Sequence, residues 1–309
     1  MDRFYLMNVF VAVAEAGSFA GASRKLGFSP PAVTRAISML EEHLGARLFT
    51  RTTRVVRLTE AGTRYLEDSR RILLEVEEAD ESAAGISATP RGELFVTAPV
   101  LFGNMFVVPA ILEYLEKYPA VNVNAVFLDR VVGLVEEGID IAIRIGDLPD
   151  SSLRATKVGM VRRVVVASPQ YLKQHGTPRH PGDLKSHRIV ASTGISSSAE
   201  WKFYANGKPV SVRVAPRLTV TTNEAAIVAA SEGWGITRLL SYQAAPLLKS
   251  GKLKIVLSKF EPPALPIHVV HLDGRRTTAK VRAFVDLAVV WLRANPDLKE
   301  TRIYSLKPR

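Results

Sequence analysis

Apolar residues recur at helical spacing in the first 45 residues and predict three helices. The residues that share one face of the first helix are Phe4, Met7, Phe10, Val11 and Ala14. Gly17 would end this helix in a left-handed conformation. Ser18 would then cap a second, short helix over about 19–26, which Gly27 ends.

The third helix has two contrasting faces. Ser29 is its expected cap, and Pro30 takes the first helical position, where a missing N–H costs nothing. One side is an apolar stripe of Val33, Ile37, Leu40 and Leu44. The other side consists of Pro31, Thr34, Arg35 and Ser38. A helix with little bulk, hydroxyl groups and a guanidinium on its free face suits the DNA major groove, and its positive dipole end favours phosphate.

After Gly45 the helical pattern gives way to short alternating segments. Leu48 and Phe49, and later Val56 and Leu58, predict two short strands. The segment between them would be an exposed basic loop that contains Arg51, Thr52, Thr53 and Arg54. The arginines of such a wing lie along phosphates or enter the minor groove. Residues 1–58 therefore predict a winged helix-turn-helix head.

Residues 59–84 predict one long helix with Thr59 as its cap. Its apolar positions step by fours and threes, as in a coiled coil of about three heptads. These positions are Tyr65, Ser69, Ile72, Val76, Ala79 and Ala83. Such a helix needs a partner, which is either the body of the same chain or the same helix of a second subunit. Gly85 and Pro90 mark a short hinge.

From residue 91 onward, strands and helices alternate, which indicates an α/β architecture. The expected strands are 94–98, 121–128, 139–145, 161–167, 218–222, 236–240, 253–257 and 267–272. The expected helices are 106–118, 131–137, 169–174, 223–232 and 278–294. The fold class is therefore α/β with an all-α amino-terminal head.

Composition narrows the classes of function. The chain has 309 residues, of which 47% are hydrophobic, so it can bury a large core. It has no run of 18 apolar residues and no signal-peptide layout, so we expect no membrane span and a cytoplasmic protein. Because cysteine is absent, disulfides, thiolate metal sites and a cysteine nucleophile are excluded.

Charge is distributed unevenly along the chain, whose net charge is +11. Residues 20–57 hold seven arginine and lysine residues against two glutamates, whereas residues 58–90 hold three against eight acidic residues. A basic block beside an acidic helix suggests a local contact with a polyanion, although an ordinary solvated face would carry the same charges.

No motif points to catalysis. The six histidines are not arranged at metal-ligand spacing, and the chain contains no H-E-x-x-H, P-loop or G-x-S-x-G motif. We therefore predict no catalytic residue, no metal and no cofactor.

Three segments of the head resemble the amino-terminal signature of LysR-type transcriptional regulators. They are FAGASRKLGFSPPAVTRAI (19–37), LEEHLGARLFTR (40–51) and LTEAG (58–62). Thr34 stands where the family often has serine, which keeps the hydroxyl. The resemblance implies that the long helix pairs two subunits on a palindromic site in double-stranded DNA. It also implies a homotetramer, and RNA polymerase is a further candidate partner.

Two later segments resemble the effector domain of the same family, which is similar to periplasmic binding proteins. They are DRVVGLVEEGIDIAIRIG (129–146) and VVASPQYL (165–172). The resemblance divides the chain into 1–58, a linker helix and hinge at 59–90, and 91–309. It implies a first lobe of about 91–162 and 267–309, a second of about 163–266, and an effector cleft between them. Where many members have a proline-ended strand, this chain has Ile-Thr-Arg-Leu at 236–239, and Arg238 could reach the cleft or hold a surface acid.

Ligands of open α/β sheets bind at the carboxyl ends of strands. In the first lobe this rule selects Thr97, Pro99, Val100 and Phe102, in the segment 97–103 whose backbone N–H groups could hold an anion, and also Arg144, which could supply a cation, and Gly146. In the second lobe it selects Ser192, Thr193, Thr222, Asn223 and Trp234. A small carboxylate, such as an aromatic acid, is the expected effector. In the alternative interpretation Thr222 and Asn223 only cap a helix, Trp234 only packs, and Arg144 only pairs with a nearby aspartate.

Three hypotheses for function follow. The first is a DNA-binding transcriptional regulator controlled by a small molecule. The second is a ligand-binding module whose head contacts other proteins, and the third is an enzyme with a DNA-binding head. Binding to promoter DNA would separate the first two, and turnover of a bound ligand would support the third.

Overall fold

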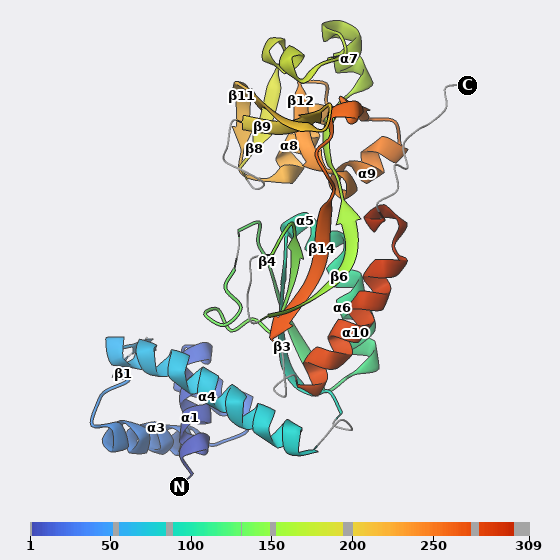
Figure 1. Ribbon diagram of the computed structural model, residues 1–309. Helices are drawn as coiled ribbons and strands as arrows, with labels where there is room; N and C mark the ends of the chain where they lie inside the picture. Colours follow the sequence, from blue (N-terminus) through green and yellow to red (C-terminus); the bar gives the residue numbers. More distant parts are fainter. Residues whose placement is uncertain are drawn as a thin grey trace. The chain divides into compact units, whose positions relative to one another are not determined.

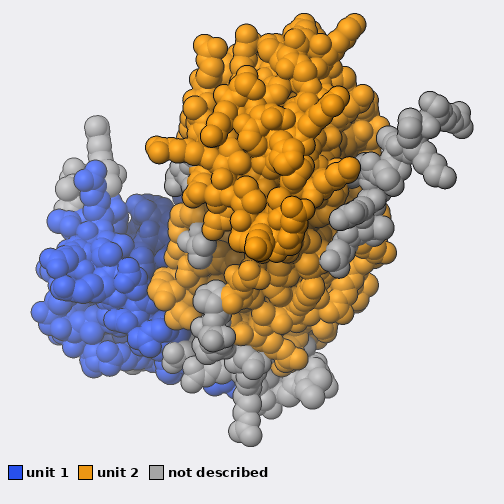
Figure 2. Space-filling model, turned by 45° about the horizontal axis from the view of Figure 1, so that its top comes forward, with its two compact units in different colours: residues 1–88 blue, residues 89–309 orange. Residues whose placement is uncertain are grey.

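The computed structural model describes residues 2–51, 56–84, 89–130, 132–148, 153–193, 200–272 and 278–299. The chain divides into two compact units, Met1–Ala88 and Thr89–Arg309 (Figure 2). No helix in the described ranges is long and apolar enough to cross a membrane.

The first unit contains the predicted helices and the predicted pair of short strands (Figure 1). Its elements are α1 (Arg3–Ala16), α2 (Phe19–Leu26), α3 (Pro30–Leu44), β1 (Phe49–Arg51), β2 (Val56–Leu58) and α4 (Glu60–Ala84). The first three helices end at Gly17, Gly27 and Gly45, whose φ angles of 60°, 68° and 63° lie in the left-handed region that glycine adopts without strain.

The apolar faces of these helices form one core, in which Phe10 contacts two other rings. Its ring centroid lies 5.2 Å from that of Phe49 and 5.3 Å from that of Tyr65. Tyr65 and the fully buried Ser69 belong to α4, so the first part of the predicted coiled-coil seam packs inside the first unit. Ile72 and Val76, further along α4, are only partly buried.

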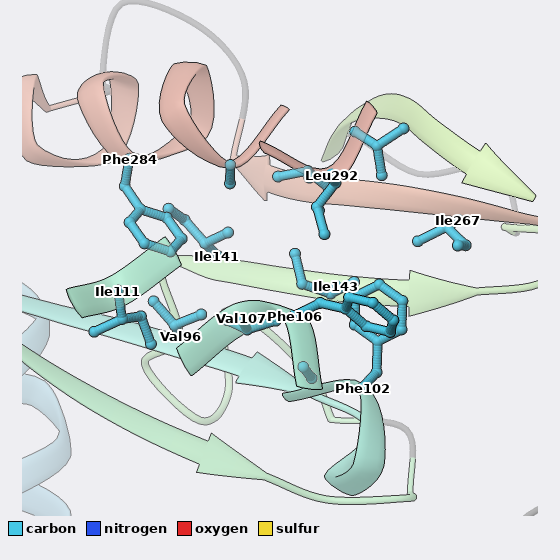
Figure 3. Packing of buried hydrophobic residues seen from close by; sticks show 14 of the residues in the cluster. Val96, Phe102, Phe106, Val107, Ile111, Ile141, Ile143, Ile267, Phe284 and Leu292 are labelled. Atoms are coloured by element: carbon cyan, nitrogen blue, oxygen red, sulfur yellow. The ribbon is translucent and has the colours of Figure 1, made fainter. Parts of the chain in front are cut away.

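The first lobe of the second unit is a sheet in the order β4-β3-β5-β14-β6. Its strands are β3 (Gly92–Ala98), β4 (Val121–Phe127), β5 (Ile141–Ile145), β6 (Leu153–Val161) and β14 (Leu265–Leu272). The helices are α5 (Val100–Phe102), a π-helix (Gly103–Val107), α6 (Val108–Lys117), α10 (Ala279–Ala294) and a short 3₁₀ helix (Pro296–Leu298). Figure 3 shows the core of this lobe, where Phe102, Phe106, Phe284 and Leu292 pack together with strand residues.

The second lobe is a sheet in the order β11-β8-β12-β7-β13. Its strands are β7 (Arg163–Ala167), β8 (Ile189–Ser192), β11 (Pro216–Val220), β12 (Ile236–Leu240) and β13 (Lys254–Val256). The helices are α7 (Pro169–His175), α8 (Asn223–Ser231), α9 (Ser241–Lys249) and 3₁₀ helices at Pro181–Ser186 and Ser258–Phe260. A hairpin of β9 (Glu200–Ala205) and β10 (Lys208–Arg213) packs on one face through Trp201 and Phe203, and α8 and α9 pack on the other.

The chain passes from the first lobe to the second at Arg162, and it returns between Phe260 and Leu265. An ion pair joins the two crossings, because Nη1 of Arg162 lies 2.7 Å from Oε2 of Glu261. Both side chains are largely buried, so the pair links the two segments that must move if the lobes change their angle.

Two expectations about secondary structure are corrected, and several elements were not predicted. Within the described part of the helix expected over 131–137, residues 134–138 form a turn instead, and Gly138, with a φ of 64°, ends it in a left-handed conformation. The strand expected over 161–167 is interrupted at Arg162, and the preceding strand β6 was not predicted. Strand β8, the hairpin β9–β10 and helix α9 were also not predicted.

Candidate DNA-binding and effector sites

The structure exposes the polar face of α3. Ser29, Pro31, Arg35 and Ser38 are exposed, whereas Val33, Ile37 and Leu40 of the predicted stripe are buried. Thr34 is partly buried, and its hydroxyl donates to the carbonyl oxygen of Pro30 at 3.1 Å. The face that was predicted to contact DNA is therefore on the surface, with Arg35 free to extend from it.

The first turn of α3 offers side chains rather than backbone donors. Pro30 and Pro31 have no N–H, and the N–H of Ala32 donates to the carbonyl oxygen of Ser29 at 2.9 Å. Ser29 is the N-cap residue, as predicted, but its side chain makes no capping hydrogen bond. Its hydroxyl is therefore available to a phosphate, and the helix dipole still favours an anion there.

Glu41 holds the base of the wing against α3. Its Oε1 accepts hydrogen bonds from the N–H groups of Leu48 at 2.8 Å and Phe49 at 3.1 Å, and its Oε2 lies 3.4 Å from Nη1 of Arg47. The Glu41 side chain is only 6% exposed. In the sequence, Glu41 is one of the two acidic residues that offset the basic charge of residues 20–57. Because its side chain is buried, its negative charge does not lie on the face that would contact DNA.

The start of α4 is packed closely against the same turn. The hydroxyl of Thr59 accepts from the N–H of Gly62 at 2.9 Å, which confirms Thr59 as the cap. A Cβ atom at Gly62 would lie 2.1 Å from the carbonyl oxygen of Leu48, so only glycine permits this approach.

The two strands of the wing pair in an antiparallel register of Phe49 with Leu58, Thr50 with Arg57 and Arg51 with Val56. Thr52, Arg54 and the side chain of Arg51 lie outside the described residues. Arg57 is exposed beside them on β2. The register confirms a wing that begins and ends at the predicted strands.

At the effector site, the start of α5 already has an anionic partner from its own chain. The N–H of Val100 donates to Oδ1 of Asp129 at 3.1 Å, and the hydroxyl of Thr97 donates to the carbonyl oxygen of Val126 at 2.6 Å. Pro99 precedes the helix, and Phe102 is fully buried in the core. The sequence analysis missed Asp129, which occupies the position expected for an anionic ligand.

The surroundings of Asp129 are acidic. Burial raises the pKa of its carboxyl group, the hydrogen bond from Val100 opposes this change, and the negative charge of Glu224 raises the pKa further. Glu224 lies in the first turn of α8, so α5 of one lobe and α8 of the other begin near each other. Burial also raises the pKa of Tyr242, with a contribution from both acids.

Residues of the second lobe meet at one edge of its sheet. Because β8 and β12 are parallel and β7 is antiparallel to β12, the ends of β8 and β12 share an edge with the start of β7. Ser192 ends β8, and the N–H and hydroxyl of Thr193 donate to the carbonyl oxygen of Val220 at 2.9 and 3.4 Å. This is the edge at the carboxyl ends of β8 and β12, where the sequence analysis expected a ligand.

The start of α8 lies at the same edge. Thr222 is the cap, and its hydroxyl accepts from the N–H of Ala225 at 3.3 Å. Asn223 is the first helical residue rather than the cap; it is 2% exposed, and its Oδ1 has no hydrogen-bond partner among the described residues. A buried amide oxygen is normally hydrogen-bonded in a stable fold, so this atom can still accept a hydrogen bond from a water molecule or a ligand.

Three predicted effector residues have other surroundings. Arg144 turns toward the carbonyl oxygen of Val132 and donates to it; burial lowers its pKa, and the charge of Glu137 opposes this. Trp234 lies between α8 and the start of β12, at the opposite edge of the sheet from Thr222. The N–H of Gly146, whose φ is 115°, donates to the carbonyl oxygen of Pro266 at 2.9 Å. Arg144 and Gly146 are therefore bonded within the first lobe, and Trp234 lies away from the edge that holds Thr222.

Comparisons with known proteins cover both units. Residues 4–63 match the family model described as "Bacterial regulatory helix-turn-helix protein, lysR family". Residues 87–292 match the family model described as "LysR substrate binding domain". An HTH-type transcriptional regulator of Xanthomonas campestris pv. campestris (strain 8004) is 36% identical over 293 residues, which cover 94% of this chain and 85% of that protein.

Solved full-length structures of similar proteins match both units of the chain. The full-length structure of AphB, a virulence activator of Vibrio cholerae and a member of the LTTR protein family, is 28% identical and covers 94% of this chain and 99% of that chain, with a TM-score of 0.63. The structure of CrgA, a LysR-type transcriptional regulator from Neisseria meningitidis, is 32% identical and covers 94% and 99%, with a TM-score of 0.60.

Proposed function

The chain belongs to the LysR family of transcriptional regulators, which are not enzymes, and from this premise we propose that it binds a palindromic operator and responds to a small organic acid. The observation that carries the DNA-binding part is the exposed polar face of α3, opposite its buried stripe. In this proposal Thr34 and Arg35 contact base edges in the major groove. Arg51, Thr52 and Arg54 of the wing, with Ser29, Pro31 and Ser38 of α3, position the head on the DNA backbone.

The proposal includes a homodimer formed through α4. Ile72 and Val76 are partly buried in the single chain, so the second half of the predicted seam retains apolar surface for a partner helix. Two heads held by such a pair would bind two half-sites one helical turn apart. We further propose a homotetramer and contact with RNA polymerase, and a protein that binds chromosomal DNA would act in the cytoplasm.

The effector part of the proposal rests on the edge where α5 and α8 begin. The unpartnered oxygen of Asn223 and the exposed Thr193 and Thr222 provide polar groups for a small molecule. A ligand bound there would contact both lobes and favour one angle between them. The Arg162–Glu261 pair at the crossings would transmit this change, because both segments share it.

Titrations of the purified full-length protein on duplex DNA test the proposal. The probe is DNA from the promoter region of its own gene, compared with scrambled DNA of equal length at several salt concentrations. We expect tighter binding to the promoter DNA, with an affinity that falls as salt rises because phosphate contacts release counterions. Equal, weak binding to both duplexes in dilute buffer would favour a head that contacts proteins and would contradict the proposal.

A further inference from the structure

Two arginines lie on the same face of the second lobe's sheet. In the antiparallel pair of β12 and β7, Leu240 is opposite Arg163 and Arg238 is opposite Val165. Residues opposite each other, and residues two apart on one strand, have side chains on the same face. Arg163 and Arg238 are therefore diagonal neighbours, and both are partly buried.

The hairpin β9–β10 supplies an aromatic surface beneath Arg238. The guanidinium carbon of Arg238 lies 5.1 Å from the ring centroid of Trp201, which is 4% exposed. Asn206 and Gly207, with φ angles of 52° and 74°, form the tight turn that pairs the two strands. A guanidinium stacked on an indole ring keeps its N–H groups in its own plane, where their outer edge can bind a carboxylate with two hydrogen bonds.

Within the described ranges, neither arginine has a carboxylate within ion-pair distance. Arg162, next to Arg163 in the chain, differs because it pairs with Glu261. Burial and the positive charge of Arg163 lower the pKa of Arg238 to about 10. Burial also lowers the pKa of Arg163, although the charge of Asp147 opposes this. Two neighbouring cations that are removed from water without a partner are unfavourable, and an anion would relieve their repulsion.

The pair shares a sheet edge with the proposed effector site. Arg163 begins β7, at the edge that also holds Thr193 and the start of α8. Both arginine side chains lie on the face that the hairpin β9–β10 covers, whereas α8 packs on the opposite face. The start of α5 is occupied by Asp129, with Glu224 nearby, and Arg144 is bonded to Val132, so these groups do not supply a positive charge for an acid. Arg163 and Arg238 provide the cations that this edge otherwise lacks.

We propose that Arg163 and Arg238, with Trp201 stacked against Arg238, bind the carboxylate group of the effector. This inference rests on the proposed function and locates its ligand. A single carboxylate can bridge the two guanidinium groups, or it can bind the edge of Arg238 while Arg163 neutralises the remaining charge.

Paired acids and amides test the proposal in the full-length protein without DNA. The probes are acetate, succinate, benzoate and salicylate, each compared with its neutral amide at equal ionic strength. Binding is measured by thermal unfolding and by calorimetry. We expect at least one acid to raise the unfolding midpoint more than its amide does, because only the acid has a charge for the arginines.

Variants assign the effect to the pair. Arg238→Met should weaken binding of that acid at least tenfold and leave the amide unaffected, whereas Arg238→Lys, which keeps the charge but not the planar fork, should retain part of the affinity. Arg217→Met removes an exposed arginine from β11 of the same lobe and should bind the acid like the wild type. Without acid, Arg238→Met should unfold at the wild-type midpoint or above it, because a cation without a partner is removed.

Three results would overturn the inference. One is equal stabilisation of the wild type by every acid and its amide. Another is acid binding that Arg238→Met leaves intact. The third is a clear drop in the midpoint of Arg238→Met without acid, which would give Arg238 a structural role. Promoter binding without acid is measured separately for the wild type, and its loss would contradict the proposed function while leaving an acid response that depends on Arg238 in place.

Discussion

The exposed face of α3 and the edge where α5 and α8 begin differ in how many of their polar groups are already bonded. On α3, the side chains of Ser29, Arg35 and Ser38 are exposed and make no hydrogen bond within the described ranges. At the effector edge, Thr97 and Val100 are bonded to other parts of the same chain. Both regions were expected to bind anions, but on α3 three of the candidate side chains are free of such bonds, although the hydroxyl of Thr34 donates to the carbonyl oxygen of Pro30.

The difference follows from how each region is held in place. A helix that packs through one stripe can leave its opposite face free, because the stripe supplies the stabilising contacts. Strand ends and the loops after them must satisfy their own backbone groups, so nearby side chains are used for that purpose. At the edge where α5 and α8 begin, we therefore propose as ligand contacts the groups that the fold leaves without a partner among the described residues, which are Asn223 and the Arg163–Arg238 pair.

The largest expected effect comes from Glu41, whose bonds support the free face of α3 from within. Glu41→Ala leaves the N–H groups of Leu48 and Phe49 without an acceptor, and we expect it to cost about 2–4 kcal/mol of local stability. Hydrogen exchange of residues 30–58 in the full-length protein measures this loss. Glu42→Ala, at the exposed neighbouring position, should change stability by less than about 0.5 kcal/mol. Equal effects of the two substitutions would contradict the role of Glu41.

The next largest effect concerns Arg35, whose exposed side chain on α3 is free to contact a base. Arg35→Ala should reduce discrimination at one base pair of the operator by about 1–3 kcal/mol. Arg54→Ala should weaken binding to all sequences similarly and lower the salt dependence by about one phosphate contact. Arg64→Ala, an exposed arginine paired with Glu60 on α4, is the control and should change neither quantity. Titrations against single-base operator variants at several salt concentrations distinguish the three; equal losses on operator and random DNA for Arg35→Ala would refute base contact.

The sequence predicts the first unit well because its signals are local. The spacing of Val33, Ile37 and Leu40 identifies the buried side of α3, and the caps at Thr59 and Gly45 mark helix ends within a few residues. Glu41 was not identified because its partners are backbone groups seven and eight residues further along, in a turn whose path the pattern does not specify.

In the second unit the decisive contacts join residues far apart in the chain. Asp129 and Val100 are 29 positions apart, and the register that places Arg238 beside Arg163 joins strands more than 70 residues apart. Strand β6 escaped prediction because its pairing with β14 shifts register near Val158, which breaks the alternation of apolar positions. The hairpin β9–β10, by contrast, has a local signal in the sequence, because Asn206–Gly207 lies between alternating apolar residues and is typical of a two-residue turn.

The smallest expected effect comes from Asp129→Asn, which removes the negative charge at the start of α5, so that this helix start, like that of α3, has no charged partner among the described residues of its own chain. The pKa of Asp129 is raised in the folded protein above its ordinary value of 3.8, so folding becomes less favourable as pH rises through the folded pKa and the carboxyl group loses its proton. Asp129→Asn keeps an oxygen that can accept from the N–H of Val100 but never becomes charged. We expect this variant to unfold at a higher midpoint than the wild type at pH 7, by less than about 1 kcal/mol because the side chain is partly exposed.

Thermal unfolding at pH 7 and at pH 3 checks the sign of this effect. The advantage of Asp129→Asn should disappear at pH 3, where the wild-type carboxyl group is protonated and neutral like the amide. Asp286→Asn removes an exposed acid from α10 and should show no comparable change between the two pH values. A lower midpoint for Asp129→Asn at pH 7 would mean that the charge of Asp129 stabilises the start of α5. The start of α5 would then differ from α3 through both the hydrogen bond to Asp129 and the negative charge of that residue.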